Sequence, residues 1–242
     1  MKTGCIQHIG KRNAQQDSIG ISKDGSVAVL ADGMGGMNSG EIISSLIVKN
    51  LLDIVADFRS DMNISALLQA VHWANITTNY ELSQKKLSLC GSTMVCSAAK
   101  SKRLLWISVG DSRVYLFRSG GLIQLNRDHN LLRKQLLYAA QGKMPFGNIG
   151  PNEELGNLTS FFGMGDLAEV DFSVEPIELL DSDMVLLMSD GIYRFLTERE
   201  IALELQVNKD PQAACNGILQ RLIQKNHPYQ DNISLIIQRV EP

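Results

Sequence analysis

The sequence predicts an α+β fold in which antiparallel sheets are covered on the outside by helices. Strand-like segments come first, two helical segments follow, and strands, two more helices and a last strand complete the order. This order is neither the regular strand–helix alternation of a parallel sheet nor a repeat array. The 242 residues, 44% of them hydrophobic, can bury a sizeable core. No linker or low-complexity segment divides the chain, so we expect residues 1–242 to form one domain.

In the first part of the chain, the spacing of apolar residues changes from that of strands to that of helices. Segment 26–31 is apolar on both faces, so it should lie at the centre of a sheet. Beyond it, Asn38 and Glu41 make a plausible capping pair, and apolar residues then follow helical spacing. The elements expected here are strands at 4–9, 18–22 and 26–31 and helices at about 38–54 and 64–85.

The second part of the chain begins with four short apolar segments separated by turn-like residues, which predicts an antiparallel meander. A later stretch, 141–157, is rich in Gly, Asn and Pro and has no periodicity; a loop of that length is usually functional or mobile. The four strands of the meander are expected at 92–99, 103–109, 112–118 and 121–126. The other elements expected are strands at 170–176, 184–189 and 233–240 and helices at 130–140, 197–207 and 211–225.

The composition argues against several classes of protein, including nucleic-acid-binding and membrane-spanning proteins. With 23 basic and 26 acidic residues the net charge is −3, and no basic stretch stands out, which argues against a nucleic-acid partner. The apolar stretches are too short to cross a bilayer, and the first residues lack the apolar segment of a signal peptide. The four cysteines show no zinc spacing, so we interpret them as reduced thiols, mostly in the core. We therefore expect a cytoplasmic protein that does not insert into a membrane.

Three aspartates stand at the ends of apolar strand segments. Asp32 and Asp190 each follow such a segment and precede a glycine, and Asp231 comes just before the last strand. Any single Asp-Gly pair is more often an ordinary turn. Three carboxylates at strand ends nevertheless suggest one shared cation, because a carboxylate at the end of a core strand is unfavourable without one. Oxygen ligands without a His or Cys cluster favour Mg²⁺ or Mn²⁺, and two such ions suit phosphoryl chemistry.

Two polar turns supply further candidates for the same site. Arg12 and Asp17 lie in the early turn, where an arginine could clamp phosphate oxygens through its planar fork, or could be an ordinary surface arginine. Asp111 lies in the Gly110-Asp111-Ser112-Arg113 turn. It is either part of a polar hairpin or another carboxylate directed at the same cluster.

Read in order, seven short motifs resemble those of the metal-dependent protein phosphatases, the type 2C serine/threonine phosphatases, in their compact bacterial form. The motifs are 12–17, Asp32-Gly33-Met34-Gly35-Gly36 with Gly40-Glu41, Gly91-Ser92-Thr93, 110–113, Asp128-His129, Ser189-Asp190-Gly191 and Asp231-Asn232. The resemblance covers nearly the whole chain. It implies a four-layer αββα sandwich with two central antiparallel sheets, each flanked by a pair of helices, and a variable flap at about 141–157.

The resemblance also implies two Mn²⁺ or Mg²⁺ ions per chain. By this likeness Asp32 bridges both ions, the carbonyl of Gly33 ligates the second, and Asp190 and Asp231 complete the first. Asp17 orients water or joins the second site.

Further roles follow from the same likeness. Arg12 holds the substrate phosphate, Asp111 helps a weaker third ion, and Asn232 is a supporting neighbour.

The activity implied is hydrolysis of phosphoserine and phosphothreonine in proteins by a water that bridges the two ions, without a phosphoenzyme. The expected substrates are phosphoproteins made by a cognate Ser/Thr kinase in a signalling pathway, and the expected state is a monomer.

Departures from the family pattern leave other functions open. Gln16 stands where many members have Glu, Met37 where many bacterial members have His, and Met34 where animal forms have His. One alternative is therefore a weakly active or inactive sensor domain that binds phosphoproteins. Another is a phosphatase of the haloacid-dehalogenase kind with an Asp nucleophile, since Asp181-Ser182-Asp183 offers an Asp-x-Asp pattern.

Overall fold

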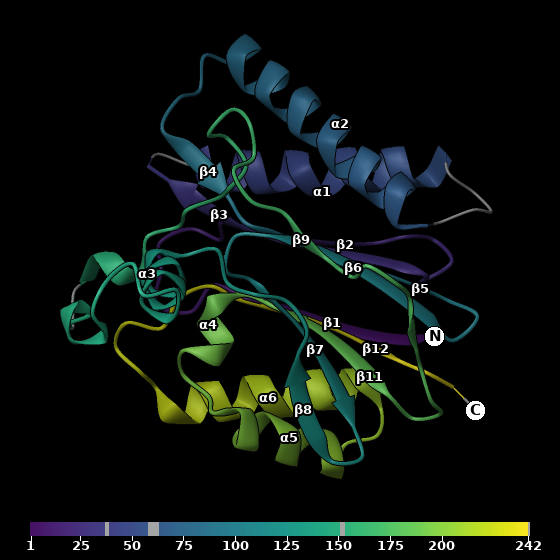
Figure 1. Cartoon of the computed structure of the whole chain (residues 1–242). Helices are drawn as coiled ribbons and strands as arrows, with labels where there is room; N and C mark the ends of the chain where they lie inside the picture. The colour runs from purple at the N-terminus through teal and green to yellow at the C-terminus, as the bar shows by residue number, and fades with distance from the viewer. Residues whose placement is uncertain (37–38, 58–62, 151–152, 242) are drawn as a thin grey trace.

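Two antiparallel sheets lie face to face, and a pair of helices covers the outer face of each sheet (Figure 1). The computed structural model describes residues 1–36, 39–57, 63–150 and 153–241. The helices on the outer faces are α1 (Ser39–Asp57) and α2 (Ile64–Gln84) on one side and α5 (Glu198–Val207) and α6 (Pro211–Lys225) on the other. The predicted αββα sandwich is therefore confirmed.

Within the described residues, seven strands form the sheet beneath α1 and α2. They run in the order β10-β6-β5-β3-β2, with β4 paired to β3 and β9 paired to β6. Their bounds are β2 (Asp17–Ile21), β3 (Val27–Gly35), β4 (Cys90–Ser92), β5 (Met94–Lys100), β6 (Arg103–Val109), β9 (Asp171–Phe172) and β10 (Ile177–Glu178). The segment from Val27 to Ala31 is fully buried between β2 and β5, as its apolar character on both faces predicted.

The described strands of the other sheet run in the order β1-β12-β11-β7-β8. Their bounds are β1 (Lys2–His8), β7 (Arg113–Arg118), β8 (Gly121–Gln124), β11 (Met184–Met188) and β12 (Ile233–Arg239). The first and last strands of the chain are neighbours, because β12 pairs with β1 on one side and with β11 on the other. The start of β12 thereby lies beside the loop that follows β1.

The predicted four-stranded meander is wrong. Strands β5 and β6 pair in one sheet and β7 and β8 in the other, so the chain crosses between sheets after Val109. Gly110 makes this crossover possible with a φ of +97°, and a Cβ at this position would lie 2.6 Å from the Thr93 side chain. The sequence did not reveal the crossover because short apolar segments with turn-like separators are also what a continuous meander has.

Three apolar layers hold the sandwich together. One lies between α1, α2 and the first sheet, and another between α5, α6 and the second sheet. The third lies between the two sheets, where Leu30 and Trp106 of one sheet share a cluster with Leu116, Leu187 and Ile236 of the other. Burial of these side chains from both sides fixes the spacing of the sheets and leaves their ends free for polar groups.

Side chains cap the helix starts that the sequence indicated. Asn63 accepts a hydrogen bond from the first turn of α2, and Asp210 does the same for α6, which begins at Pro211. Thr197 and Glu200 form a complete capping box at the start of α5. The capping pair proposed for α1 includes Asn38, which lies outside the described residues.

Among the strand boundaries that differ from the prediction, two bear on the site or shorten a strand markedly. The strand expected at 26–31 does not end at Ala31 but continues as β3 to Gly35, because Gly33–Gly35 pair with Ser92–Cys90 of β4. The first Asp-Gly pair is therefore part of a strand and not a turn. The strand expected at 170–176 is reduced to β9, which pairs with β6 over two residues.

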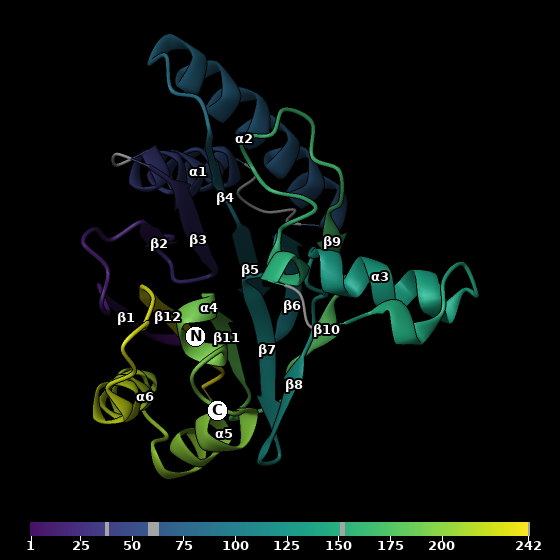
Figure 2. The same cartoon turned by 90° about the vertical axis from the view of Figure 1, so that its left-hand side faces the viewer.

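Helix α3 (Leu131–Ala140) projects to one side of the sandwich (Figure 2). It is followed by the segment expected to be a flap, in which the described residues form two short 3₁₀ turns, Phe146–Asn148 and Glu153–Gly156. Within the described parts of the chain, none of the helices has the length and apolar character needed to span a membrane.

Candidate active site

Five aspartates from both sheets converge at one end of the sandwich. Asp17 begins β2 and pairs across the strands with Asp32 of β3, and Asp111 lies in the crossover to β7. Asp190 begins the short helix α4 (Asp190–Tyr193) directly after β11, and Asp231 lies just before β12. Burial raises the pKa of Asp32 well above its ordinary value, and the charges of the other four aspartates raise it further. All five carboxylates therefore belong to one electrostatic cluster.

Asp17 is the most enclosed member of this cluster. Burial raises its pKa to about 6, although Ser189 donates a hydrogen bond to its Oδ2 at 2.9 Å. The other oxygen, Oδ1, is buried and has no hydrogen-bond partner among the described residues. A buried carboxylate oxygen without a donor is unfavourable, and a cation is the partner that satisfies it best.

Arg12 lies at the rim of the site, as the sequence suggested. Its Nε and Nη2 donate to Oδ1 and Oδ2 of Asp231 at 2.7 and 2.5 Å. The Arg12 side chain is 61% exposed, so this fork-to-fork pair is open to solvent on one side.

Asn232 fixes the loop that carries Arg12. Its Nδ2 donates to the carbonyl oxygens of Ile9 and Ala14 at 2.9 and 3.0 Å, and its Oδ1 accepts from the backbone N–H of Gln16 at 2.8 Å. Gly10 allows the close approach, because a Cβ there would lie 2.1 Å from the carbonyl oxygen of Asp231. The loop between β1 and β2 is thereby held against the start of β12.

Gln16 also braces this loop through its side chain. The side-chain Nε2 of Gln16 donates to the carbonyl oxygen of Gly35 at 2.9 Å. The main-chain carbonyl oxygen of Gln16 accepts a hydrogen bond from the N–H of Gly33. A glutamate at this position could not donate the bond to Gly35. The departure from the usual Glu is therefore matched by a contact that only the amide can make.

The two other departures are methionines. Met34 lies in β3 opposite Gly91 of β4, and Met37 lies outside the described residues.

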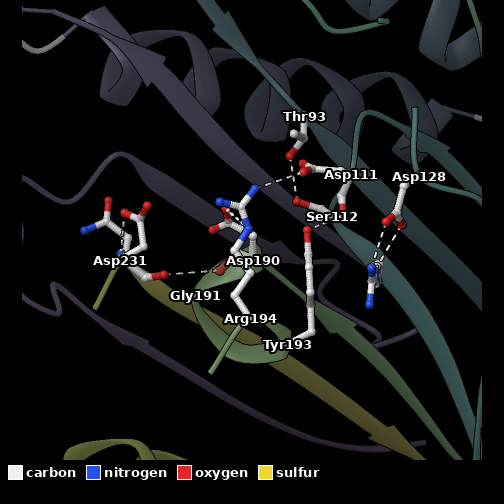
Figure 3. A network of polar contacts seen from close by, with 12 residues as sticks. Thr93, Asp111, Ser112, Asp128, Asp190, Gly191, Tyr193, Arg194 and Asp231 are labelled. Carbon is white, nitrogen blue, oxygen red and sulfur yellow. Dashed lines mark hydrogen bonds and ion pairs between the residues drawn. The ribbon is translucent and has the colours of Figure 1, made fainter. Parts of the chain in front are cut away.

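The crossover that carries Asp111 is held by a network of polar contacts (Figure 3). Tyr193 donates its hydroxyl to the Asp111 carbonyl oxygen at 3.0 Å, and the hydroxyls of Thr93 and Ser112 are 2.6 Å apart. His129 is buried, and its Nδ1 accepts from the N–H of Gly110 at 3.1 Å. Burial raises the pKa of the Asp111 carboxyl to about 6. The backbone that carries this carboxylate is thus fixed in place.

Arg113, at the end of the same motif, pairs with a neighbouring carboxylate. It pairs with Asp128 through two hydrogen bonds of 3.0 and 2.7 Å and lies over the ring of Tyr193. It therefore supports the crossover from the side.

Arg194 is a site residue that the sequence reasoning missed. Its Nε lies 3.1 Å from Oδ2 of Asp190, and its Nη2 lies 3.6 Å from Oδ2 of Asp111. The available signal was its position four residues after Asp190, which places both side chains on one side of a helical turn.

The Asp-x-Asp alternative has no support in the structure. Asp181 pairs with Lys102, and Asp183 is buried against Arg118, so both carboxylates have structural partners outside the five-aspartate cluster.

The family described as protein phosphatase 2C matches residues 6–207. The chain belongs to the protein phosphatase 2C family. A relative from Listeria monocytogenes named serine/threonine phosphatase stp is 27% identical over 240 residues, covering 93% of this chain and 90% of that protein.

Solved structures of other proteins agree with the fold. The Mycobacterium tuberculosis serine/threonine phosphatase PstP/Ppp has a TM-score of 0.85 at 22% identity, covering 100% of this chain and 99% of that one. The catalytic domain of PstP in complex with two manganese ions has a TM-score of 0.81 at 23% identity, covering 100% and 98%. At these identities, the likeness concerns the fold.

In this member of the protein phosphatase 2C family, guanidinium groups partly neutralise the aspartates. Within the described ranges, no three His, Cys, Asp or Glu side chains lie together in a way that could hold a metal ion as they are oriented here. The carboxylate of Asp231 is paired with the guanidinium of Arg12, and that of Asp190 is paired with the guanidinium of Arg194. The residues nevertheless fit a hard divalent cation, because the donors are all oxygens and Asp17 Oδ1 is buried without a partner.

Proposed function

We propose that this chain is a metal-dependent protein phosphatase that hydrolyses phosphoserine and phosphothreonine in proteins. The observation that carries the proposal is the buried, unpartnered Oδ1 of Asp17 within a cluster of five aspartates from both sheets. Membership of the protein phosphatase 2C family and a relative named serine/threonine phosphatase support the same activity.

The aspartate cluster is the proposed holder of two Mn²⁺ or Mg²⁺ ions. The proposed ligands are Asp17, Asp32, Asp190, Asp231 and the carbonyl of Gly33. When bound, such ions supply charge that neutralises the phosphate and lowers the pKa of water. The solved structure of the PstP catalytic domain is a complex with two manganese ions, which supports the choice of Mn²⁺ in this proposal.

The protein side chains have separate tasks in this proposal. Arg12 binds the substrate phosphate through its planar fork, because its exposed guanidinium lies at the rim of the site and can exchange Asp231 for phosphate oxygens. Asp17 orients water at the site, held by the hydroxyl of Ser189. Asn232 positions Arg12 by fixing its loop.

We further propose that residues 1–242 are a single catalytic domain, with 141–157 as a flap that contacts the substrate protein. The proposed substrates are phosphoproteins made by a cognate Ser/Thr kinase, and the proposed state is a signalling monomer in the cytoplasm. The free thiols of all four cysteines, three of them buried, agree with a reducing compartment.

The activity is tested by turnover of phosphoserine, phosphothreonine and phosphotyrosine peptides during a Mn²⁺ titration. We expect Mn²⁺-dependent hydrolysis of the first two, and a loss on the order of 100-fold or more in Asp190→Asn, because a ligand is removed. Asp181→Asn is the matched control, since Asp181 pairs with Lys102 outside the five-aspartate cluster and should keep full activity.

Unchanged Mn²⁺-dependent hydrolysis in Asp190→Asn would contradict the proposal. Tight phosphopeptide binding without turnover at saturating Mn²⁺ would instead favour the sensor alternative.

A further inference from the structure

The guanidinium of Arg194 lies between two buried carboxylates of different elements (Figure 3). Its Nε faces Asp190 of α4 at 3.1 Å and its Nη2 faces Asp111 of the crossover at 3.6 Å. The side chains of Asp190 and Asp111 are only 13% and 9% exposed, whereas that of Arg194 is 50% exposed. The arginine therefore reaches inward from the surface and places one positive charge between two enclosed negative charges.

The backbone on both sides of this contact is fixed. The N–H of Arg194 donates to the carbonyl oxygen of Asp190 at 3.1 Å, which closes the turn of α4. The hydroxyl of Tyr193 donates to the carbonyl oxygen of Asp111, so the same turn is tied to the crossover. The buried side chain of Ile192 anchors the turn in the apolar layer between α5, α6 and the sheet that contains β11 and β12. The backbone that carries the two carboxylates is thus held by contacts that do not involve the Arg194 side chain.

Two like charges in a buried site repel each other and require a cation. A guanidinium supplies one positive charge at this place, and that charge opposes the entry of a divalent ion a few ångströms away. Without Arg194, the two carboxylates would present oxygen donors to the same space, which is the chemistry that Mn²⁺ and Mg²⁺ prefer.

We propose that Arg194 is a built-in cation that occupies the space between Asp111 and Asp190 and prevents a metal ion from binding there. The inference rests on the proposed function, because it assumes that two ions are held by the other ligands of the cluster. It revises the expectation for Asp111, which serves Arg194 and not a third ion. The metal content of the protein is then two ions per chain.

The test is the number of Mn²⁺ ions bound per chain, measured by equilibrium dialysis with metal analysis. We expect two ions for the wild type and three for Arg194→Met, which keeps the length of the side chain and removes its charge. The additional ion should be lost again when Asp111→Asn is added to Arg194→Met. Arg194→Lys, which keeps a positive charge, should stay at two.

A matched control is Arg221→Met, because Arg221 pairs with Glu204 on the outer helices and its loss should leave two ions. Thermal unfolding of each variant verifies that it is folded, and Arg194→Gln replaces Arg194→Met if that variant does not fold. Three ions in the wild type, or two in the folded Arg194→Met and Arg194→Gln variants, would overturn the role of Arg194 while leaving the proposed phosphatase intact. A wild type that binds no Mn²⁺ would overturn the proposed function and this inference with it.

Discussion

The side chain of Asn232 holds the loop between β1 and β2 in place. It makes three hydrogen bonds to backbone groups of the loop between β1 and β2, and these bonds connect β12 to the segment that presents Arg12. An amide can donate and accept at once, so neither aspartate nor alanine can replace it. The residue next to the proposed ligand therefore sets the position of Arg12, the arginine proposed to bind phosphate.

We predict that Asn232→Ala raises the KM for a phosphopeptide about 10-fold and changes kcat much less, because Arg12 is no longer positioned while the aspartates remain. It should also lower the free energy of unfolding by roughly 1–3 kcal/mol, since buried backbone groups lose their partners. Steady-state kinetics and urea unfolding measure both effects.

Asn216→Ala is the control for this prediction, because Asn216 is exposed on α6. Equal KM values for Asn232→Ala and the wild type would show that Asn232 does not position Arg12.

At the scale of elements, the site depends on close contacts of backbone with backbone. The turn of α4 packs so tightly on the segment before β12 that a Cβ at Gly191 would lie 1.9 Å from the carbonyl oxygen of Asn232. The carbonyl oxygen of Gly191 also accepts a hydrogen bond from Gln230 at 2.7 Å. Glycine is required here by distance, since it allows α4 to bring Asp190 next to Asp231.

We predict that Gly191→Ala lowers the free energy of unfolding by about 2–4 kcal/mol, because the added methyl group forces α4 away from β12. The same shift should weaken Mn²⁺ binding, since it moves Asp190. Urea unfolding and calorimetry measure the two effects. Gly147→Ala should be neutral in both, because no atom lies within 4 Å of a Cβ at that position.

A stable Gly191→Ala variant with the Mn²⁺ affinity of the wild type would mean that α4 can shift without cost to the site.

At the scale of the whole molecule, the aspartate cluster opposes the packing of the two sheets. Asp17 and Asp32 belong to one sheet, and the segments that carry Asp190 and Asp231 belong to the other. The apolar layer between the sheets holds these charges together although they repel each other. Stability of the metal-free protein should therefore depend on the ionisation of the cluster.

For Asp17 the sign follows from its pKa, which burial raises from 3.8 to about 6 in the folded protein. A carboxyl with a raised folded pKa binds its proton more tightly when folded, so its contribution to stability is full below the unfolded pKa and is lost as the pH rises through about 6. We predict that the stability of metal-free wild type relative to Asp17→Asn falls as the pH rises from about 4 to about 6 and is level above that range.

The measurement is urea unfolding of both proteins with a chelator present. Groups with shifted pKa values outside the aspartate cluster, including the buried His129, are common to both proteins and cancel in the comparison. Asp32 does not cancel, because the charge of Asp17 contributes to its raised pKa. Parallel pH profiles would contradict the raised pKa of Asp17.

Much of the fold could be read from local patterns. The capped starts of α2, α5 and α6 follow from Asn63, Thr197 and Asp210, because a cap and the apolar spacing after it are local properties. The crossover at Gly110 could not be read in this way. Strands β6 and β7 have the same local pattern whether they pair with each other or lie in different sheets, and only the packing of the whole chain decides between these arrangements.

By itself, the sequence determined the chemistry available to this protein: an oxygen-only set of aspartates with an arginine, in the order of the protein phosphatase 2C family. The tertiary structure decided how these groups are used. It made Asp32 and Gly33 part of a strand by pairing them with β2 and β4, and it brought Asp111 to Arg194 across more than eighty positions of the chain. The physical reason is that residue types and short spacings are local, whereas strand partners and charge pairs are set by distances in space.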